Sequence, residues 1–303
     1  MAELVQALRE LGARCRFAGG AGRLPLDVEG PIHGGAVRLD ASRSSQFASA
    51  LLLTLPSVPG DSVLRLTGAI VSEPYLDATL AVVRRHGVRI DRRGRTFVIP
   101  GSQRYHGDRF DVPGDASSAA YLWAAAAVTG GEVRVRGIPS NWPQADLAVL
   151  DLLERAGANV ERVRDGATVR GRARRGFALD LTGAPDLYPL AAVVAATVPA
   201  RSRLRGAPHV VHKESDRRAG AVRLARALGA EVEANRREVR IQGTRTPSAV
   251  EITDLDDHRL VMSAAVGALA GGGPSDVGDA RAVAKSFPGF WVGLAALGGR
   301  IDR

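Results

Sequence analysis

The amino-acid sequence predicts an α/β protein assembled from repeated βαβαββ units. Short apolar strand segments alternate with amphipathic or small-residue helices along the chain, which is the pattern of a mixed α/β fold. A second observation is that five helices each run into a glycine, at intervals of roughly 70 residues. These glycines are Gly12, Gly87, Gly157, Gly229 and Gly298. A glycine at this place is typical of a helix end where the backbone turns into the left-handed region.

The first complete unit shows the order of the elements. Its pattern predicts a strand over residues 37–42, a helix over 44–53, a strand over 62–68, a helix over 72–87 and a hairpin over 88–101. The same order is expected in a second unit over residues 109–171, a third over 177–243 and a fourth over 250–302. The second unit opens with an expected strand at 109–115 and the fourth with one at 250–255.

The start of the chain differs from the other units. Residues 1–30 contain only the second half of a unit, a helix over residues 1–12 and a hairpin over 14–28. Two explanations stay open: the architecture tolerates an open edge here, or an upstream segment is missing.

Composition narrows the class of protein. With 303 residues, of which 45% are hydrophobic and 24% charged, the chain can bury the core of one large or two ordinary domains. The single cysteine, Cys15, cannot form an internal disulfide or a thiolate zinc site, which favours a reducing compartment. The longest apolar runs are too short to span a bilayer, and the first nine residues lack the pattern of a secretion signal. We therefore expect a soluble cytoplasmic protein without a membrane partner.

The chain is basic, with a net charge of +9, and only Lys213 and Lys285 among its 41 basic residues are lysine. A nucleic-acid partner is the first hypothesis for such a charge. However, the arginines are spread along the chain, and aromatic residues, which could stack on bases, make up only 5%. We expect no nucleic-acid partner, and instead a basic cleft that collects small anionic substrates.

Polar clusters occur where a predicted strand leads into a helix. Ser44, Ser45 and Gln46 form one such cluster, and Ser117 and Ser118 lie in another. Free backbone N–H groups at a helix start attract anions, so these residues could bind a phosphate. Ordinary N-capping explains the same residues, and the two interpretations stay open.

The later units carry charged clusters at equivalent positions. Asp186 is either a helix cap or a general base, and Lys213 and Arg217 would share one face if the intervening residues are helical. Asp257, His258 and Arg259 form the next such cluster, and Lys285 lies at the junction that follows it. No His or Cys spacing suggests a metal site. Related junctions in a repeat tend to line one surface, which here would suit phosphorylated or carboxylated metabolites.

Seven segments carry a family resemblance when taken together and in order. They are SSQFASALLL, SEPYLDATL, GDASSAAYLWAAAA, PDLYPLAAVVAA, HKESDRR, DDHR and AKSFPGF. The chain resembles 3-phosphoshikimate 1-carboxyvinyltransferase (EPSP synthase) over nearly its whole length. The resemblance implies a two-domain enolpyruvyl transferase fold of βαβαββ units, N-terminally incomplete in this sequence. Residues 1–113 would be the remnant of the first lobe and residues 114–303 the second lobe.

The resemblance also implies a reaction of the shikimate pathway of aromatic amino acid biosynthesis. The enolpyruvyl group of phosphoenolpyruvate would pass to the 5-hydroxyl of shikimate 3-phosphate, without a metal or organic cofactor. Asp186 would be the general base, Lys213 would assist the proton transfer, and Glu214 would protonate the methylene carbon of phosphoenolpyruvate. The residues implied for shikimate 3-phosphate are Ser44, Ser45, Gln46, Ser72, Tyr75, Asp186 and Lys213. Those implied for phosphoenolpyruvate are Gln46, Arg217, Arg259 and Lys285.

The sequence departs from the family in one respect. The LPGSKS-like and GNAGT-like segments of the family, which contribute substrate-binding residues, do not occur in it. Three hypotheses therefore stay open: the carboxyl portion of a synthase, with a separate N-terminal fragment as a candidate partner; a non-catalytic paralogue that binds a phosphorylated ligand or a protein; and a basic nucleic-acid-binding module. The retained acidic and basic residues favour the first, and we expect the chain alone to be impaired in turnover.

Overall fold

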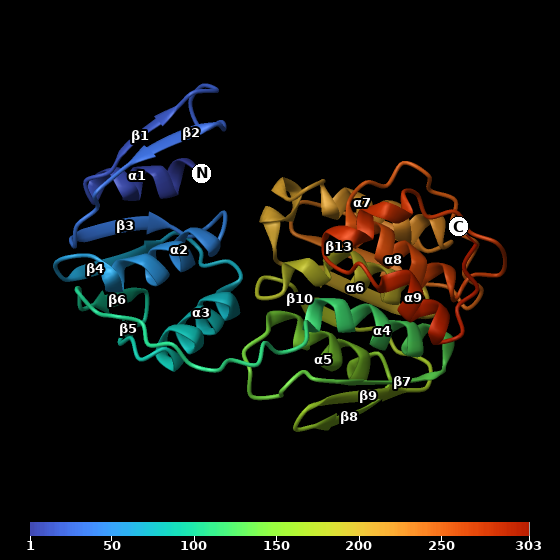
Figure 1. Cartoon of the computed structure of the whole chain (residues 1–303). Coiled ribbons are helices and arrows are strands. Elements are labelled where there is room, and N and C mark those ends of the chain that lie inside the picture. Colours follow the sequence, from blue (N-terminus) through green and yellow to red (C-terminus); the bar gives the residue numbers. More distant parts are fainter. Residues whose placement is uncertain (303) are drawn as a thin grey trace. The chain divides into compact units, whose positions relative to one another are not determined.

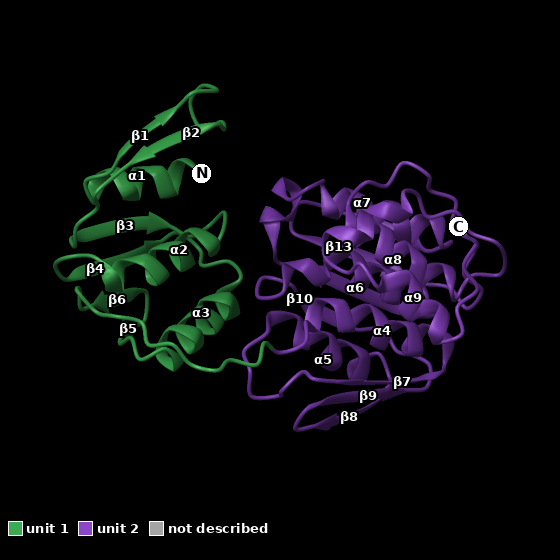
Figure 2. Ribbon diagram, viewed as in Figure 1, with its two compact units in different colours: residues 1–112 green, residues 113–303 purple. Residues whose placement is uncertain are grey.

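The computed structural model describes residues 1–302. The chain folds as two compact units, Met1–Val112 and Pro113–Arg303, which Figure 2 shows in different colours. Figure 1 labels the helices and strands along the chain.

The first unit contains a four-stranded sheet and a separate hairpin. Its elements are α1 (Ala2–Glu10), β1 (Arg14–Phe17), β2 (Leu26–Glu29), β3 (Ala36–Asp40), α2 (Gln46–Thr54), the 3-10 turn η1 (Leu55–Ser57), β4 (Ser62–Thr67), α3 (Glu73–Arg85), β5 (Asp91–Arg93) and β6 (Thr96–Ile99). The sheet order is β3-β4-β6-β5, and β1 pairs with β2 alone among the described residues.

Strand β4 shows why this sheet forms. Its residues alternate strictly between buried and exposed, so that Leu64 and Leu66 enter the core while Arg65 faces solvent. Strands β3 and β4 are parallel neighbours. Because parallel strands end at the same edge of a sheet, the loops that follow them, residues 41–45 and 68–72, leave the sheet side by side.

The second unit contains two sheets and a central set of helices. Its elements up to residue 205 are α4 (Ala116–Thr129), β7 (Glu132–Arg136), η2 (Ala145–Leu147), α5 (Ala148–Arg155), β8 (Asn159–Val163), β9 (Gly166–Arg170), β10 (Ala178–Asp180), η3 (Pro185–Leu187), α6 (Tyr188–Ala196) and β11 (Arg201–Arg205). The remaining elements are η4 (Pro208–His212), α7 (Arg217–Ala227), β12 (Glu231–Ala234), β13 (Glu238–Gln242), α8 (His258–Ala268), η5 (Ala280–Lys285) and α9 (Phe290–Ala296). The strand orders are β7-β9-β8 and β10-β11-β13-β12.

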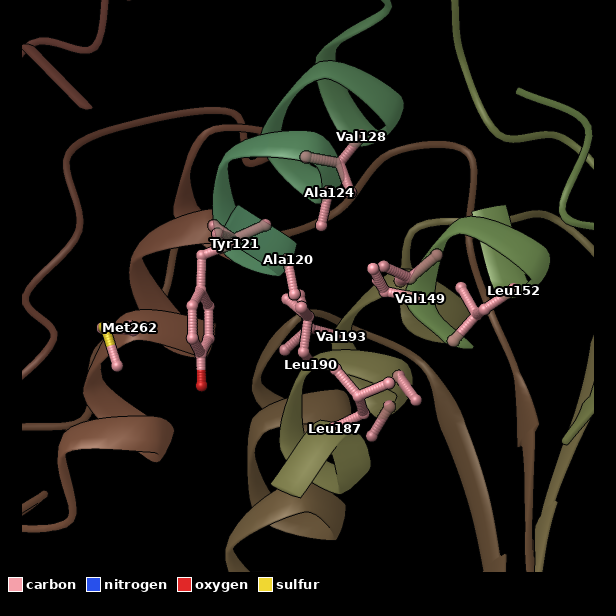
Figure 3. Close-up of a cluster of buried hydrophobic side chains, with 14 of the residues drawn as sticks. Ala120, Tyr121, Ala124, Val128, Val149, Leu152, Leu187, Leu190, Val193 and Met262 are labelled. Atoms are coloured by element: carbon pink, nitrogen blue, oxygen red, sulfur yellow. The ribbon is translucent and has the colours of Figure 1, made fainter. Parts of the chain in front are cut away.

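The core of the second unit lies between helices that are apolar on nearly all sides. Every residue of α6 is buried, as is expected of a helix without a polar face. Figure 3 shows side chains from α4, α5, α6 and α8 that meet in this core, among them Tyr121, Ala124, Val149, Leu190 and Met262. The helices are thereby packed rigidly, which fixes the residues at their first turns.

The repeat predicted from the glycines is confirmed. The φ angles of Gly12, Gly87, Gly157, Gly229 and Gly298 are +105°, +79°, +98°, +86° and +99°. Each glycine follows the last turn of a helix and redirects the chain, where an L side chain would be strained.

Two predicted strands and the hairpin expected at the end of the fourth unit do not form. Residues 109–115 are irregular, because Pro113 lacks an N–H group for a sheet and Val112 is 82% exposed. Residues 250–255 make only the isolated bridge between Glu251 and Asp276. Residues 297–302 form no hairpin. Within the described residues, no helix combines the length and the apolar character that a membrane crossing needs.

Candidate active site

Eight charged side chains of the second unit form one continuous network of ion pairs, which we call the charged cluster. Its members are Asp146, Asp186, Lys213, Glu214, Arg217, Asp257, Arg259 and Lys285. Six of them were predicted site residues, and the structure brings all six together. They come from the starts of η2, η3, α7 and α8, from the loop before α7 and from the end of η5.

Arg217 lies at the centre of the charged cluster. Its side chain is only 2% exposed, and its Nε donates to Asp257 Oδ2 at 2.9 Å. Its Nη1 donates to Asp186 Oδ1 at 2.7 Å, and its Nη2 donates to Glu214 Oε2 at 2.6 Å. A buried guanidinium needs such partners because desolvation of an unpaired charge is costly. Arg217 therefore organises three carboxylates.

Asp186 is contacted by three cations. Besides Arg217, the Arg259 Nη2 atom lies 3.0 Å from Asp186 Oδ2, and the Lys213 Nζ atom lies 3.7 Å from Asp186 Oδ1. Lys213 and Arg217 do not share a helix face, which corrects the expectation from their spacing. Lys213 caps η4 in an extended conformation, whereas Arg217 is the first residue of α7. The two cations nevertheless converge on the same carboxylate oxygen.

Glu214 is held between Arg217 and Lys285. The Lys285 Nζ atom donates to Glu214 Oε1 at 3.1 Å. Burial raises the pKa of Glu214, but a backbone hydrogen bond, Arg217 and Lys285 outweigh this effect and lower the pKa to about 2. Glu214 is therefore ionised at neutral pH in this arrangement. To donate a proton, it must first lose some of its contacts with these cations.

Asp257 supports both Arg217 and the start of α8. It is the N-cap of α8, where its Oδ1 accepts the backbone N–H of Arg259 at 2.9 Å, and its Oδ2 accepts the hydroxyl of Ser215 at 2.9 Å. Burial would raise the pKa of Asp257, but Arg217, the Arg259 amide and Ser215 lower it below the ordinary value. In the sequence, this residue is indistinguishable from an ordinary helix cap.

Asp146, a member of the charged cluster, and two residues near the cluster were not predicted as site residues. Asp146 and Tyr121 are buried beside Arg259, and His209 is buried with neither ring nitrogen hydrogen-bonded. Burial, followed by the charge of Lys213, lowers the pKa of His209 below its ordinary value. Nothing local in the sequence marks these side chains, because their burial depends on tertiary packing. Within residues 1–302, no group of three His, Cys, Asp or Glu side chains could hold a metal ion.

The first unit carries the other predicted residues on its own two loops. Ser44 and Ser45 precede α2, where the Ser44 hydroxyl accepts the backbone N–H of Gln46 at 3.2 Å and Ser45 is buried. Ser72 is the N-cap of α3, is also buried and has a φ of +55°. Tyr75 lies in the first turn of α3, and its backbone N–H donates to Ser72 at 3.1 Å. The three serines, which come from two different loops, thus lie along one edge of the sheet.

A family model, named relatives and a solved structure that match this chain all belong to one family. The family model described as EPSP synthase (3-phosphoshikimate 1-carboxyvinyltransferase) matches residues 1–294. A protein of Thermococcus kodakarensis with the name 3-phosphoshikimate 1-carboxyvinyltransferase is 42% identical over 296 residues, covering 97% of this chain and 71% of that protein. One of Methanocorpusculum labreanum with the same name is 37% identical over 298 residues, covering 98% and 70%. The solved EPSP synthase of Acinetobacter baumannii is 25% identical, with a TM-score of 0.80 over 99% of this chain and 70% of that one. The chain belongs to the EPSP synthase family.

Proposed function

We propose that the chain serves the transfer of the enolpyruvyl group from phosphoenolpyruvate to the 5-hydroxyl of shikimate 3-phosphate. The products are 5-enolpyruvylshikimate 3-phosphate and phosphate, on the shikimate pathway to the aromatic amino acids. The observation that carries the proposal is the charged cluster, which pairs four cations with carboxylates at helix starts in a member of this family. Acid–base chemistry on anionic substrates needs both kinds of group in one place.

Asp186 takes the role of general base. It accepts the proton of the 5-hydroxyl while the oxygen attacks C2 of phosphoenolpyruvate. Lys213, 3.7 Å from Asp186, stabilises the developing charge on that hydroxyl. Glu214 supplies the proton to C3 of phosphoenolpyruvate once an incoming anion has drawn Lys285 or Arg217 from it. In the elimination that follows, the ionised Glu214 takes a proton back from C3, the C2–O bond to phosphate breaks as the C2=C3 double bond re-forms, and Asp186 returns its proton to the departing phosphate.

The residues that bind the substrates are assigned by matching cations and hydroxyl groups to the anionic groups of each substrate. Arg217, Arg259 and Lys285 face the carboxylate and phosphate of phosphoenolpyruvate, and Gln46 contributes to both substrates. The 3-phosphate of shikimate 3-phosphate is bound by the serines of the first unit, with Tyr75 beside the ring. A helix start with free N–H groups and hydroxyls suits this phosphate. The residues assigned to it are Ser44, Ser45 and Ser72.

We also propose an assignment of the two lobes, a cellular location and a partner polypeptide. We assign residues 1–113 to the first enolpyruvyl transferase lobe and residues 114–303 to the second. The lone cysteine supports a location in the reducing cytoplasm. A polypeptide carrying the LPGSKS-like and GNAGT-like segments is the partner we propose for full turnover.

The test is phosphate release by the 303-residue chain with both substrates, alone and with such a partner polypeptide. We expect the chain alone to turn over slowly and the partner polypeptide to increase this turnover markedly. The Asp186→Asn and Glu214→Gln variants should not show this increase. Lys213→Arg should also reduce turnover, because a guanidinium cannot replace a compact ammonium at the 5-hydroxyl. An exposed-surface control is Arg223→Lys, which should keep full activity. Undiminished turnover in Asp186→Asn would refute the assignment of the base.

A further inference from the structure

Asp146 is a buried carboxylate that the mechanism above does not use. It lies in η2, its side chain is 1% exposed, and it precedes α5. The neighbouring Gln144 fixes η2 against the start of α4. The Gln144 Oε1 accepts the N–H of Ala116 at 2.8 Å, and its Nε2 donates to the carbonyl of Gly114 at 2.8 Å. The backbone around Asp146 is therefore fixed against α4 independently of the Asp146 side chain.

The two oxygens of Asp146 have different surroundings. Oδ2 accepts the Ser117 hydroxyl at 2.5 Å and lies 3.9 Å from the Nη1 atom of Arg259. Oδ1 is buried and has no hydrogen-bond partner. An orphaned buried carboxylate oxygen is costly, so its presence calls for a reason beyond packing.

Arg259 connects Asp146 to Asp186. The guanidinium places Nη2 on Asp186 at 3.0 Å and Nη1 toward Asp146, and its side chain is only 12% exposed. Tyr121 of α4 also interacts with Arg259 through its hydroxyl. Asp146 and Tyr121 thus contact Arg259 from elements that take no part in the proposed proton transfers.

We propose that Asp146 is a positioning residue, which holds the guanidinium of Arg259 in place while Asp186 changes its protonation state. The inference rests on the proposed function, in which Asp186 takes a proton and Arg259 binds phosphoenolpyruvate. When Asp186 is protonated, it no longer offers a charge to Arg259. Asp146 is the second carboxylate of the charged cluster that contacts Arg259, so Arg259 keeps its orientation through that step.

The pKa of Asp146 predicts that its contact with Arg259 depends on pH. Burial raises the pKa of Asp146 to about 6, against the opposing effects of Arg259 and Ser117. The other charged groups that face it are Asp186 and Asp115, which also raise its pKa. Asp146 therefore gains its charge near pH 6, and the hold on Arg259 should tighten above that pH.

The first experiment follows the Arg259 side chain without any substrate. The Nε resonance of Arg259, assigned by its loss in Arg259→Lys, is titrated in the isotope-labelled full chain. We expect a transition with a midpoint near pH 6 that disappears in Asp146→Asn and persists in Asp151→Asn, a surface carboxylate of α5. His258 lies next to Arg259, and burial, followed by the charge of Arg259, lowers the pKa of His258 below its ordinary value, so the comparison between variants is what assigns the midpoint to Asp146.

A second variant keeps the test decisive if Asp146→Asn does not fold. Ser117→Ala retains the carboxylate but removes a hydrogen bond that lowers its pKa, so the midpoint should move to higher pH. An Arg259 titration that is unchanged in Asp146→Asn, or in Ser117→Ala where the first variant is unfolded, would overturn the proposal.

The second experiment separates this inference from the proposed function. Calorimetry at pH 8 measures phosphoenolpyruvate binding in the wild type, Asp146→Asn, Arg259→Ala and the double variant. We expect Asp146→Asn to weaken binding about tenfold, and to have no further effect once Arg259 is absent. If Arg259→Ala leaves binding unchanged, the proposed role of Arg259 fails, while the titration still decides its positioning. If Arg259→Ala weakens binding and Asp146→Asn does not, Asp146 has no positioning role.

Discussion

At the scale of single residues, the charged cluster shows how much a buried cation depends on its partners. Arg217 donates to three carboxylates, of which Asp257 is fully buried. Removing a guanidinium from such a site leaves several carboxylates close together without compensation. Arg217 thus positions three carboxylates and neutralises part of their charge, in addition to the role in substrate binding that we propose for it.

Arg217→Ala should destabilise the chain by about 3–5 kcal/mol, because it breaks a buried ion-pair network. Urea unfolding followed by circular dichroism measures the change. The control is Arg223→Ala on the same helix, where the ion pair with Asp254 is exposed and the loss should stay below about 1 kcal/mol. Equal losses in the two variants would show that the network adds no stability.

The ionised state of Glu214 predicts a pH dependence of stability. Its folded pKa of about 2 lies below the ordinary value of 4.5, so its stabilising contribution is fully present above about pH 4.5 and is lost as the pH falls toward 2. Glu214→Gln should therefore be less stable than the wild type at pH 6, and the gap should narrow as the pH falls. A gap that stays constant between pH 6 and pH 2.5 in chemical unfolding would contradict this.

The sequence could indicate only part of the candidate site. The predicted residues that join the charged cluster are the six that stand out through their place in the motifs: Asp186, Lys213, Glu214, Arg217, Arg259 and Lys285. Asp257 and Asp146 precede helices, where carboxylates are common caps. Their participation depends on which side chains the folded chain buries beside them, and no local pattern encodes that.

At the scale of elements, apolar helices were predicted most accurately. The first helix expected in the second unit forms as α4, Ala116–Thr129, which begins after the Asp115 cap and ends at Gly130 in the left-handed conformation. The expected strand at 109–115 failed because an alternating pattern is not sufficient without a neighbour to pair with. Strands depend on partners that are distant in sequence, whereas helices satisfy their backbone groups locally.

A substitution at Gly157 tests whether the glycine that follows each repeated helix is needed for its left-handed conformation. Gly157→Ala should cost about 1 kcal/mol, because its φ of +98° strains an L residue even though a Cβ atom would meet only the Arg175 side chain. Gly293→Ala is the matched control. It lies within α9 with open space around it, so alanine should stabilise the helix slightly. Thermal unfolding distinguishes the two signs, and a stabilising Gly157→Ala would contradict the left-handed assignment.

At the scale of the whole molecule, the residues proposed for substrate binding are divided between the two compact units. The serines assigned to shikimate 3-phosphate belong to residues 1–112, whereas the charged cluster belongs to residues 113–302. Each unit has its own buried core, so each can present its residues on a packed scaffold. The contribution of each unit to substrate binding can therefore be tested separately by substitution.

Shikimate 3-phosphate should bind the chain weakly through the first unit. Calorimetry is expected to give a dissociation constant that rises severalfold in Ser44→Ala and Ser45→Ala, because each removes a hydroxyl donor to a phosphate. Ser57→Ala, at an exposed position in η1, should have no effect. Absence of binding at millimolar ligand would count against the serine site.

The balance of charges in the cluster has a consequence for the heat of binding. Its four cations and four carboxylates cancel when all are ionised, so a multiply charged anion enters a site with no net positive charge. The anion raises the proton affinity of the carboxylates around it. The protein should therefore take up protons from the buffer when phosphoenolpyruvate binds. The enthalpy measured for its binding should then change with the ionisation enthalpy of that buffer, most strongly near pH 6, where Asp146 titrates.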